Sequence, residues 1–173
     1  NPGRWYAVLI LQMSNSMMAT TITKAPRESF TVSSRITRSA DANSLGMVFG
    51  GQILEWMDMA ASMCARRHCN SRVNTVSTQT DFLKPLRIGH IARLEVRVTR
   101  SFRTSLEVRV EVFDEDSYTN TETKSAVGVF LMVGLDENLK PAVVPELRPE
   151  TELDKQLWNE AGERRQQRKI KGT

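Results

Sequence analysis

Residues 52–68 read QILEWMDMAASMCARRH, and this stretch decides the fold that the sequence predicts. Its apolar side chains recur at steps of three and four residues, at Ile53, Met57, Ala60, Ala61 and Cys64. That period places them on one face of an α-helix, and a face this apolar needs a partner layer. Gly50 and Gly51 precede the stretch and let another backbone or a ligand approach the first helical turn. The sequence therefore predicts one long helix that a sheet covers.

Alternating apolar and polar residues predict the strands of that sheet. Residues 91–99 and 106–112 alternate apolar with charged side chains, so each is half-buried and the two form an antiparallel hairpin. Residues 30–38 and 73–82 have strand-like patterns, and residues 125–135 are apolar on both faces, as in a strand covered on both sides. One strand, a helix and four further strands make an α+β order, in which a mostly antiparallel sheet curls around the helix.

The two ends of the chain differ from this core. Residues 1–28 begin at Asn1 and are set aside as a leader segment of unknown role, native or added for expression. Residues 29–149 would hold the sheet and its helix. In residues 150–173, Thr151 and Asp154 have the spacing of a capping box that opens an amphipathic helix, and the end of that helix is strongly basic.

Composition excludes several classes of protein. The 173 residues are 40% hydrophobic and 25% charged, which excludes a disordered chain. The longest apolar run is much shorter than the roughly 18 residues of a membrane helix, so we expect no membrane span. Two cysteines give no support to a disulfide framework, so we expect a cytoplasmic protein, or a mitochondrial one if residues 1–28 are a transit segment.

The residues that common cofactor sites require are missing from the sequence. Two histidines, without paired cysteine ligands, provide neither a zinc site nor a Cys/His nucleophile pair. The glycine motifs of phosphate loops and dinucleotide sites are absent too. We therefore expect no metal and no cofactor. The net charge of +4 favours anionic partners without naming one.

Residues 41–58, DANSLGMVFGGQILEWMD, carry the motif that points to a function. The pattern N-x-x-G-x-x-F-G-G starts at Asn43, and W-M-D ends at Asp58. Together with RHC at residues 67–69, FLKPLRIG at 82–89 and RTSLEV at 103–108, it resembles the acyl-CoA thioesterases of the hotdog fold over roughly residues 30–165. The resemblance implies a long helix wrapped by a curved antiparallel sheet. It also implies hydrolysis of acyl-CoA to free fatty acid and coenzyme A.

The resemblance assigns roles to individual residues. Asn43 and Asp58 would act together, with Asp58 either activating water as a general base or attacking the thioester directly. The N–H groups near Gly50 and Gly51 would meet the negative charge that develops on the thioester oxygen. The phosphates of coenzyme A need cationic and hydroxyl partners. The matching candidates are Lys84, Arg87, Arg103, Thr104 and Ser105.

Two other functions of the same fold were weighed. A hotdog dehydratase needs a histidine in its loop, and residues 43–51 contain none. A non-catalytic acyl-CoA-binding regulator stays the alternative, although the carboxylate of Asp58 favours the enzyme. We expect acyl-CoA as the ligand and no nucleic acid. The resemblance further implies a homodimer, gathered into a homohexamer as a trimer of dimers, in which Asn43 and Asp58 of one site come from different subunits.

Overall fold

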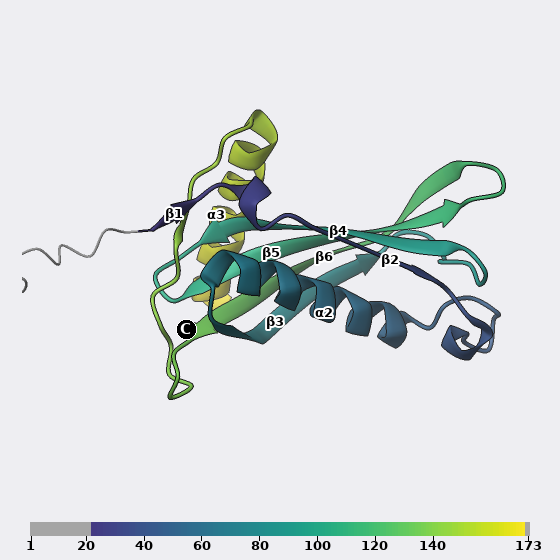
Figure 1. Ribbon diagram of the computed structural model, residues 1–173, viewed down its shortest axis with the longest axis horizontal. Helices are drawn as coiled ribbons and strands as arrows, with labels where there is room; N and C mark the ends of the chain where they lie inside the picture. The colour runs from purple at the N-terminus through teal and green to yellow at the C-terminus, as the bar shows by residue number, and fades with distance from the viewer. Residues whose placement is uncertain (1–21, 172–173) are drawn as a thin grey trace, which may run out of the picture.

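The computed structural model describes residues 22–171 as one curved sheet with a helix on each side (Figure 1). Most of the predicted leader segment, residues 1–21, lies outside the described residues. In chain order the elements are β1 (Thr23–Lys24), η1 (Pro26–Glu28), β2 (Thr31–Ile36), η2 (Ser39–Asp41), α2 (Gly50–Cys69), β3 (Arg72–Phe82), β4 (Ile91–Ser101), β5 (Ser105–Asp116), β6 (Thr121–Leu135), β7 (Glu146–Leu147) and α3 (Glu152–Lys171).

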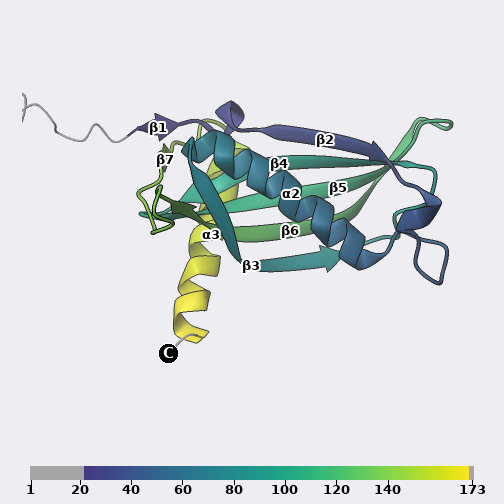
Figure 2. The same ribbon diagram turned by 60° about the horizontal axis from the view of Figure 1, so that its bottom comes forward.

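The main sheet has five antiparallel strands in the order β2-β4-β5-β6-β3. The predicted hairpin is β4 with β5, in which Val96 faces Val110. The strand that is apolar on both faces, β6, lies between β5 and β3. Figure 2 shows α2 crossing the concave face of this sheet diagonally. The α+β architecture of a long helix wrapped by a curved antiparallel sheet is confirmed.

The core lies between α2 and the inward side chains of the strands. Met57, Ala61 and Cys64 are fully buried on α2, as their spacing predicts. The packing is close, because a Cβ added at Gly128 on β6 would lie 2.7 Å from the Met57 Cε atom. The helix is slightly longer than predicted and includes Gly50. It ends at Cys69, and the next residue, Asn70, has a left-handed backbone (φ 50°) and donates its N–H to the Arg66 carbonyl at 2.8 Å.

The packed chain begins before the predicted domain boundary at residue 29. Residues 23–24 form β1, which pairs in parallel with β7. The next two residues, Ala25 and Pro26, are buried. Within the described part of the chain, residues 23–26 therefore pack against the rest of the structure.

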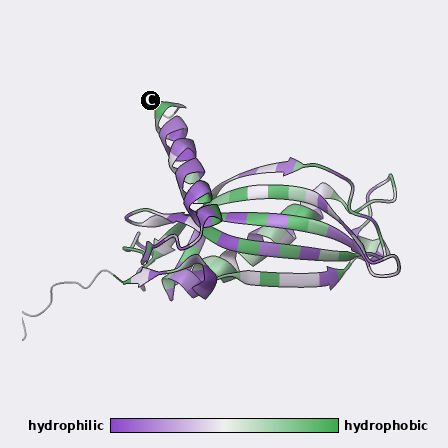
Figure 3. Cartoon of the chain, turned by 90° about the horizontal axis from the view of Figure 1, so that it is seen from above, coloured by the Kyte–Doolittle hydropathy of each residue, from purple (hydrophilic) through white to green (hydrophobic). Residues whose placement is uncertain are grey.

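The C-terminal helix α3 lies on the other face of the sheet from α2. Its predicted capping box is present, since the Asp154 N–H donates to Thr151 Oγ1 at 3.1 Å and the Thr151 N–H donates to Asp154 Oδ2 at 2.9 Å. Leu157 and Ala161 are its buried residues, and hydrophilic side chains cover most of the rest (Figure 3). Neither helix within residues 22–171 combines the length and apolar character that a membrane crossing requires.

Candidate active site

Asp58 lies in the middle of α2, on a side of the helix that is only partly covered. Its Oδ1 atom accepts a hydrogen bond from the Thr75 hydroxyl at 2.6 Å. It also lines a cavity of about 430 Å³, whose wall includes the apolar side chains of Trp56, Met59 and Met63. A carboxylate with one oxygen held by a hydroxyl and with an open cavity beside it is able to accept a proton from a bound molecule.

Thr75 lies directly before an irregularity in β3. The pairing of β3 with β6 shifts between Thr75 and Ser77, so Val76 has no partner and forms a bulge. A bulge bends its strand and changes which side chains face inward. Thr75 is not among the candidate residues that the sequence predicts. Its role depends on a contact across 17 residues between a helix and a strand, and no local pattern shows such a contact.

Asn43 lies in the loop between η2 and α2, where its side chain fixes the loop. Its Oδ1 atom accepts hydrogen bonds from the N–H groups of Leu45, at 2.8 Å, and Met47, at 3.2 Å. Both bonds use the carbonyl oxygen of the amide. The Nδ2 group is therefore the part of Asn43 that is available to donate a hydrogen bond to a ligand.

The two glycines at the start of α2 have different surroundings. Gly50 lines a cavity of about 360 Å³ together with Asn43. Its N–H opens the helix, where no carbonyl of the preceding turn can accept it. At Gly51 a Cβ would lie 2.4 Å from the ring of Phe49, an exposed side chain that would have to move, and Gly51 does not line this cavity. Of the two, Gly50 is the one placed to meet a ligand beside Asn43.

The two predicted catalytic residues do not meet within one chain. Asn43 and Gly50 line one cavity, and Asp58 lines another. Gly50 and Asp58 are eight residues apart on α2, which corresponds to about 12 Å along the helix axis. Within the described chain the two predicted catalytic residues therefore line separate cavities.

The comparisons with known proteins agree on one family. Residues 45–120 match the model of the Thioesterase superfamily. The acyl-CoA thioester hydrolase YkhA of Bacillus subtilis is 36% identical over 88% of this chain and 89% of its own length. The chain belongs to the acyl-CoA thioester hydrolases.

Solved structures of such hydrolases share the fold of this hydrolase. A hexameric acyl-CoA thioesterase superposes with a TM-score of 0.85 at 35% identity, covering 88% of this chain and 98% of that one. An acyl-CoA hydrolase of Staphylococcus aureus, solved with butyryl coenzyme A and coenzyme A, has a TM-score of 0.80 at 31% identity. That match covers 87% of this chain and 94% of the other. The hotdog fold is thereby confirmed.

The candidate residues for coenzyme A lie at opposite ends of the hydrolase sheet. Lys84 lines the Asn43 cavity, and the Arg87 Nε atom donates to Asp114 Oδ2 at 2.7 Å nearby. Arg103 and Thr104 lie in the β4–β5 turn, at the other end of a strand of 11 residues, or roughly 35 Å away. Within one chain, the residues predicted to bind coenzyme A therefore do not lie close together.

The fifth candidate, Ser105, is 7% exposed at the start of β5. Its carbonyl accepts the Phe102 N–H at 2.7 Å, so the residue helps to close the β4–β5 turn. Burial leaves its hydroxyl little access to a phosphate group. Arg103, which is exposed in the same turn, is better placed for that contact.

The thiols of the hydrolase have the properties of core residues. Burial raises the pKa of Cys64 and of Cys69 to about 11, so both stay protonated at neutral pH. A protonated, enclosed thiol is a poor nucleophile. Within residues 22–171, no group of three His, Cys, Asp or Glu side chains is arranged to hold a metal ion.

Proposed function

We propose that this hydrolase cleaves acyl-CoA thioesters with Asp58 as the general base. The carboxylate takes a proton from a water molecule as that water attacks the thioester carbonyl, and free fatty acid and coenzyme A leave. The observation that carries the proposal is the geometry of Asp58, with one oxygen held by the Thr75 hydroxyl and an open cavity beside it. Positioned acid–base groups of this kind contribute roughly 10² to 10⁴ in rate.

A second observation supports Asn43, Asp58 and Thr75 as one catalytic unit. The Staphylococcus aureus hydrolase has been solved with an asparagine, an aspartate or a threonine replaced by alanine. Those three positions follow one another at intervals of 15 and 17 residues. The same intervals separate Asn43 from Asp58, and Asp58 from Thr75. In the unit we propose, the Asn43 amide and the Gly50 N–H stabilise the oxyanion while Asp58 activates water.

Two copies of the chain would complete this unit. Strand β3 is an edge of the sheet and leaves its outer row of backbone groups without a strand partner. If two β3 strands pair antiparallel around a twofold axis, the Phe82 end of one lies beside the Arg72 end of the other. Phe82 lines the Asn43 cavity, and Thr75 is near Arg72. This pairing brings the Asn43 of one subunit to the Asp58 of its partner.

The same pairing of subunits brings the candidate coenzyme A-binding residues close together. It places the Lys84 and Arg87 end of one subunit beside the Arg103 and Thr104 end of the other. A thioesterase with the same fold is hexameric. We accordingly propose a homodimer as the smallest active unit of this hydrolase, assembled as a trimer of dimers.

A hydrolysis assay tests the proposal against the regulator alternative. Acyl-CoA is mixed with the protein and the released thiol is measured, together with binding of the same acyl-CoA. Catalytic thiol release that disappears in Asp58→Ala, while binding persists, supports the hydrolase mechanism. Tight binding without turnover by the unaltered protein would establish the regulator instead. After a single turnover in ¹⁸O-water, label in the Asp58 carboxylate would establish direct attack, because general-base catalysis leaves that carboxylate unlabelled.

A further inference from the structure

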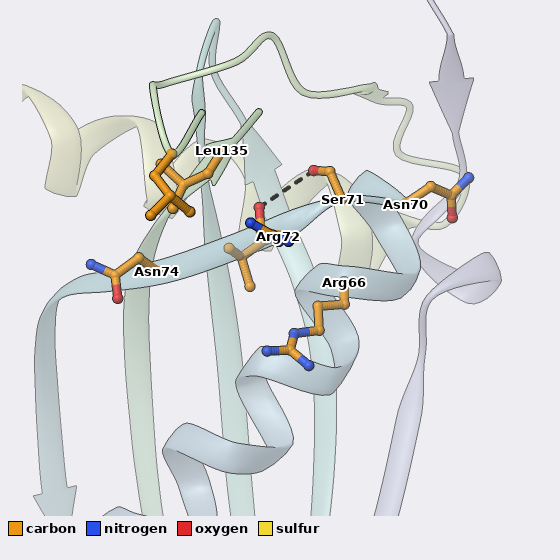
Figure 4. A pocket seen from close by; sticks show the side chains of 8 residues that line it. Arg66, Asn70, Ser71, Arg72, Asn74 and Leu135 are labelled. Atoms are coloured by element: carbon orange, nitrogen blue, oxygen red, sulfur yellow. Dashed lines mark hydrogen bonds between the residues drawn. The ribbon is translucent and has the colours of Figure 1, made fainter. Parts of the chain in front are cut away.

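Polar side chains near the two ends of α2 differ in their exposure to solvent. Around a cavity of about 960 Å³ at the C-terminal end, Arg66, Arg72 and Asn74 are exposed (Figure 4). Towards the N-terminal end, the side chain of Asp114 is only 2% exposed. The proposed mechanism does not use this acid. A charge that is removed from water needs partners, and the partners of Asp114 indicate its role.

Asp114 takes an inward position of β5 at which the alternation of the strand predicts an apolar residue. Val108, Val110 and Val112 precede it on the same side, and all three are fully buried. A carboxylate at the end of such a row is costly to bury unless other groups pair with it. The side chains that pair with Asp114 are thereby tied to the sheet.

Two side chains of one connection meet the Asp114 carboxylate. The Arg87 Nε–H donates to Oδ2 at 2.7 Å, and His90 Nδ1 lies 3.0 Å from Oδ1. The angles of the second contact do not make a hydrogen bond, and neither atom has another hydrogen-bond partner among residues 22–171. When His90 is protonated, it adds a second positive charge beside the carboxylate. Both residues belong to the β3–β4 connection, residues 83–90, which Asp114 therefore holds onto the sheet.

The β3–β4 connection is joined to the loop that carries Asn43. Arg87 pairs with Met47 in an isolated antiparallel bridge. The next residue, Val48, donates its N–H to the Leu86 carbonyl at 2.9 Å. Met47 accepts the Asn43 N–H at 2.7 Å on its carbonyl and donates its own N–H to Asn43 Oδ1 at 3.2 Å. Only two residues therefore separate the buried carboxylate from the Asn43 amide.

Thr37, which directly follows β2, holds the backbone of the same connection. Its hydroxyl donates to the Arg87 carbonyl at 2.7 Å, and its N–H donates to the His90 carbonyl at 2.9 Å. Its carbonyl accepts the Gly89 N–H at 3.0 Å. These bonds do not depend on Asp114. Loss of the carboxylate should therefore shift the connection without unfolding it.

A second buried acid of β5 provides a comparison. Glu107 is fully buried on the other face of the sheet, where two arginines of α3 donate to its oxygens. Neither of those arginines lines the cavity that contains Asn43. Arg87, the partner of Asp114, directly follows one residue of that cavity wall and pairs with another. The two acids are alike in burial and pairing, and they differ in their connection to the catalytic loop.

We propose that Asp114 is a positioning residue for thioester hydrolysis. Through Arg87 and His90 it holds the Asn43 amide at the place where the oxyanion forms, without touching the substrate. The inference rests on the proposed function, which assigns oxyanion stabilisation to Asn43. It extends that function to a residue that lines neither of the two catalytic cavities.

The test measures kcat with saturating butanoyl-CoA. In Asp114→Asn the side chain keeps its size and loses its charge, so no cavity is created. We expect kcat to fall roughly tenfold, because a displacement of about 1 Å caused by a remote mutation costs up to about a hundredfold. Glu107→Gln is the matched control, and it should leave kcat per folded molecule unchanged.

The same change is then made in Asn43→Ala. Groups that act as one unit are not additive, so Asp114→Asn should lower the residual kcat of Asn43→Ala by less than about twofold. An effect of Asp114 that does not pass through Asn43 would cost the full tenfold there. His90→Gln keeps the Asp114–Arg87 hydrogen bond, and with it the fold. It should show the same pattern with a loss of about threefold.

The inference is overturned if kcat of Asp114→Asn equals that of the unaltered hydrolase, or if the loss is as large in the Asn43→Ala background. It is also overturned if Asp114→Asn does not fold and His90→Gln keeps the full rate. Full activity of Asn43→Ala, or no hydrolysis of butanoyl-CoA by the unaltered protein, would instead refute the proposed function.

Discussion

Two acidic residues of this hydrolase show opposite ways of placing a carboxylate among apolar neighbours. Glu107 on β5 is fully buried, and Arg164 and Arg168 of α3 donate to its oxygens at 2.8 and 3.2 Å. Asp58 has a single hydroxyl partner, that of Thr75, and an open cavity. A carboxylate that is enclosed by guanidinium groups serves to stabilise the folded structure. A charge with an accessible oxygen remains available for chemistry.

The largest expected effect tests Asp58. Asp58→Ala should reduce kcat by about two to four powers of ten, because a general base is lost. Its melting temperature should stay close to that of the unaltered protein, since the residue is only partly buried. Stopped assays of thiol release and thermal unfolding measure the two quantities. Activity near the original level in a folded variant would remove Asp58 from the mechanism.

The reverse pattern is expected at Glu107. Glu107→Ala leaves two partly exposed arginines without their acid, and it should lower the free energy of unfolding by about 2–4 kcal/mol. The value of kcat per folded molecule should not change. Denaturant unfolding measures the loss, and Glu163→Ala, which removes an exposed acid on α3, is the control. A stable but inactive Glu107→Ala protein would contradict the division between the two acids.

A mixing experiment tests whether the open side of Asp58 faces a second chain. Asn43→Ala and Asp58→Ala proteins are each expected to be nearly inactive. Random exchange of subunits gives heterodimers with one intact site, so about a quarter of the original activity should return. Labelled subunits verify the exchange. If exchange is complete and activity does not return, each chain builds its own site.

A smaller effect is expected at Thr75. Thr75→Val removes the hydroxyl that holds Asp58 Oδ1, and kcat should fall by roughly tenfold, the cost of one hydrogen bond to a charged group. Thr75→Ser keeps the hydroxyl and should restore most of the rate. A loss of rate in Thr75→Ser, with the full rate kept in Thr75→Val, would indicate that the methyl group matters and the hydrogen bond does not.

The smallest expected effect concerns a third ionisable group, which is buried in its neutral form. Burial lowers the pKa of His68 below its ordinary value, and its Nε2 atom lies 3.0 Å from the Pro145 carbonyl. The unfolded chain therefore binds this proton more readily than the folded one. The stability contributed by His68 is full above its ordinary pKa of about 6.5 and is lost as pH falls through the lowered value. Unfolding measurements from pH 7.5 to 5 should show a smaller decline in His68→Gln.

The parts of the fold that repeat a simple period could be predicted from the sequence. The buried face of α2 follows steps of three and four residues, and β4 and β5 follow strict alternation, so their pairing was predictable. The ends of these strands were harder to predict from the sequence. The strand β5 continues to Asp116 and β6 begins at Thr121, because backbone pairing across the hairpin extends beyond the apolar alternation.

The site was predictable only where its residues lie in a recognisable motif. Asn43 and Asp58 share the spacing of such a motif, whereas the position of Thr75 depends on a contact between a helix and a strand. The candidate residues for binding the phosphates of coenzyme A lie in or near predicted turns. The sequence of a turn does not show at which end of a sheet that turn lies. The basic end of α3 illustrates the same point, since Arg164 and Arg168 have the charge of a free tail but are paired with Glu107.

The parallel pairing of β1 with β7 has a consequence for the order in which the chain folds. The two strands lie about 120 residues apart in the sequence, and each contributes two residues to the pair. During synthesis at roughly 5–20 residues per second, β1 leaves the ribosome about 6–25 s before its partner exists. Closing a loop of that length for so few hydrogen bonds is favourable only once the sheet has formed. Among the described strands, β1 is thus made first and is among the last to pair, because its pairing requires that translation has passed residue 147.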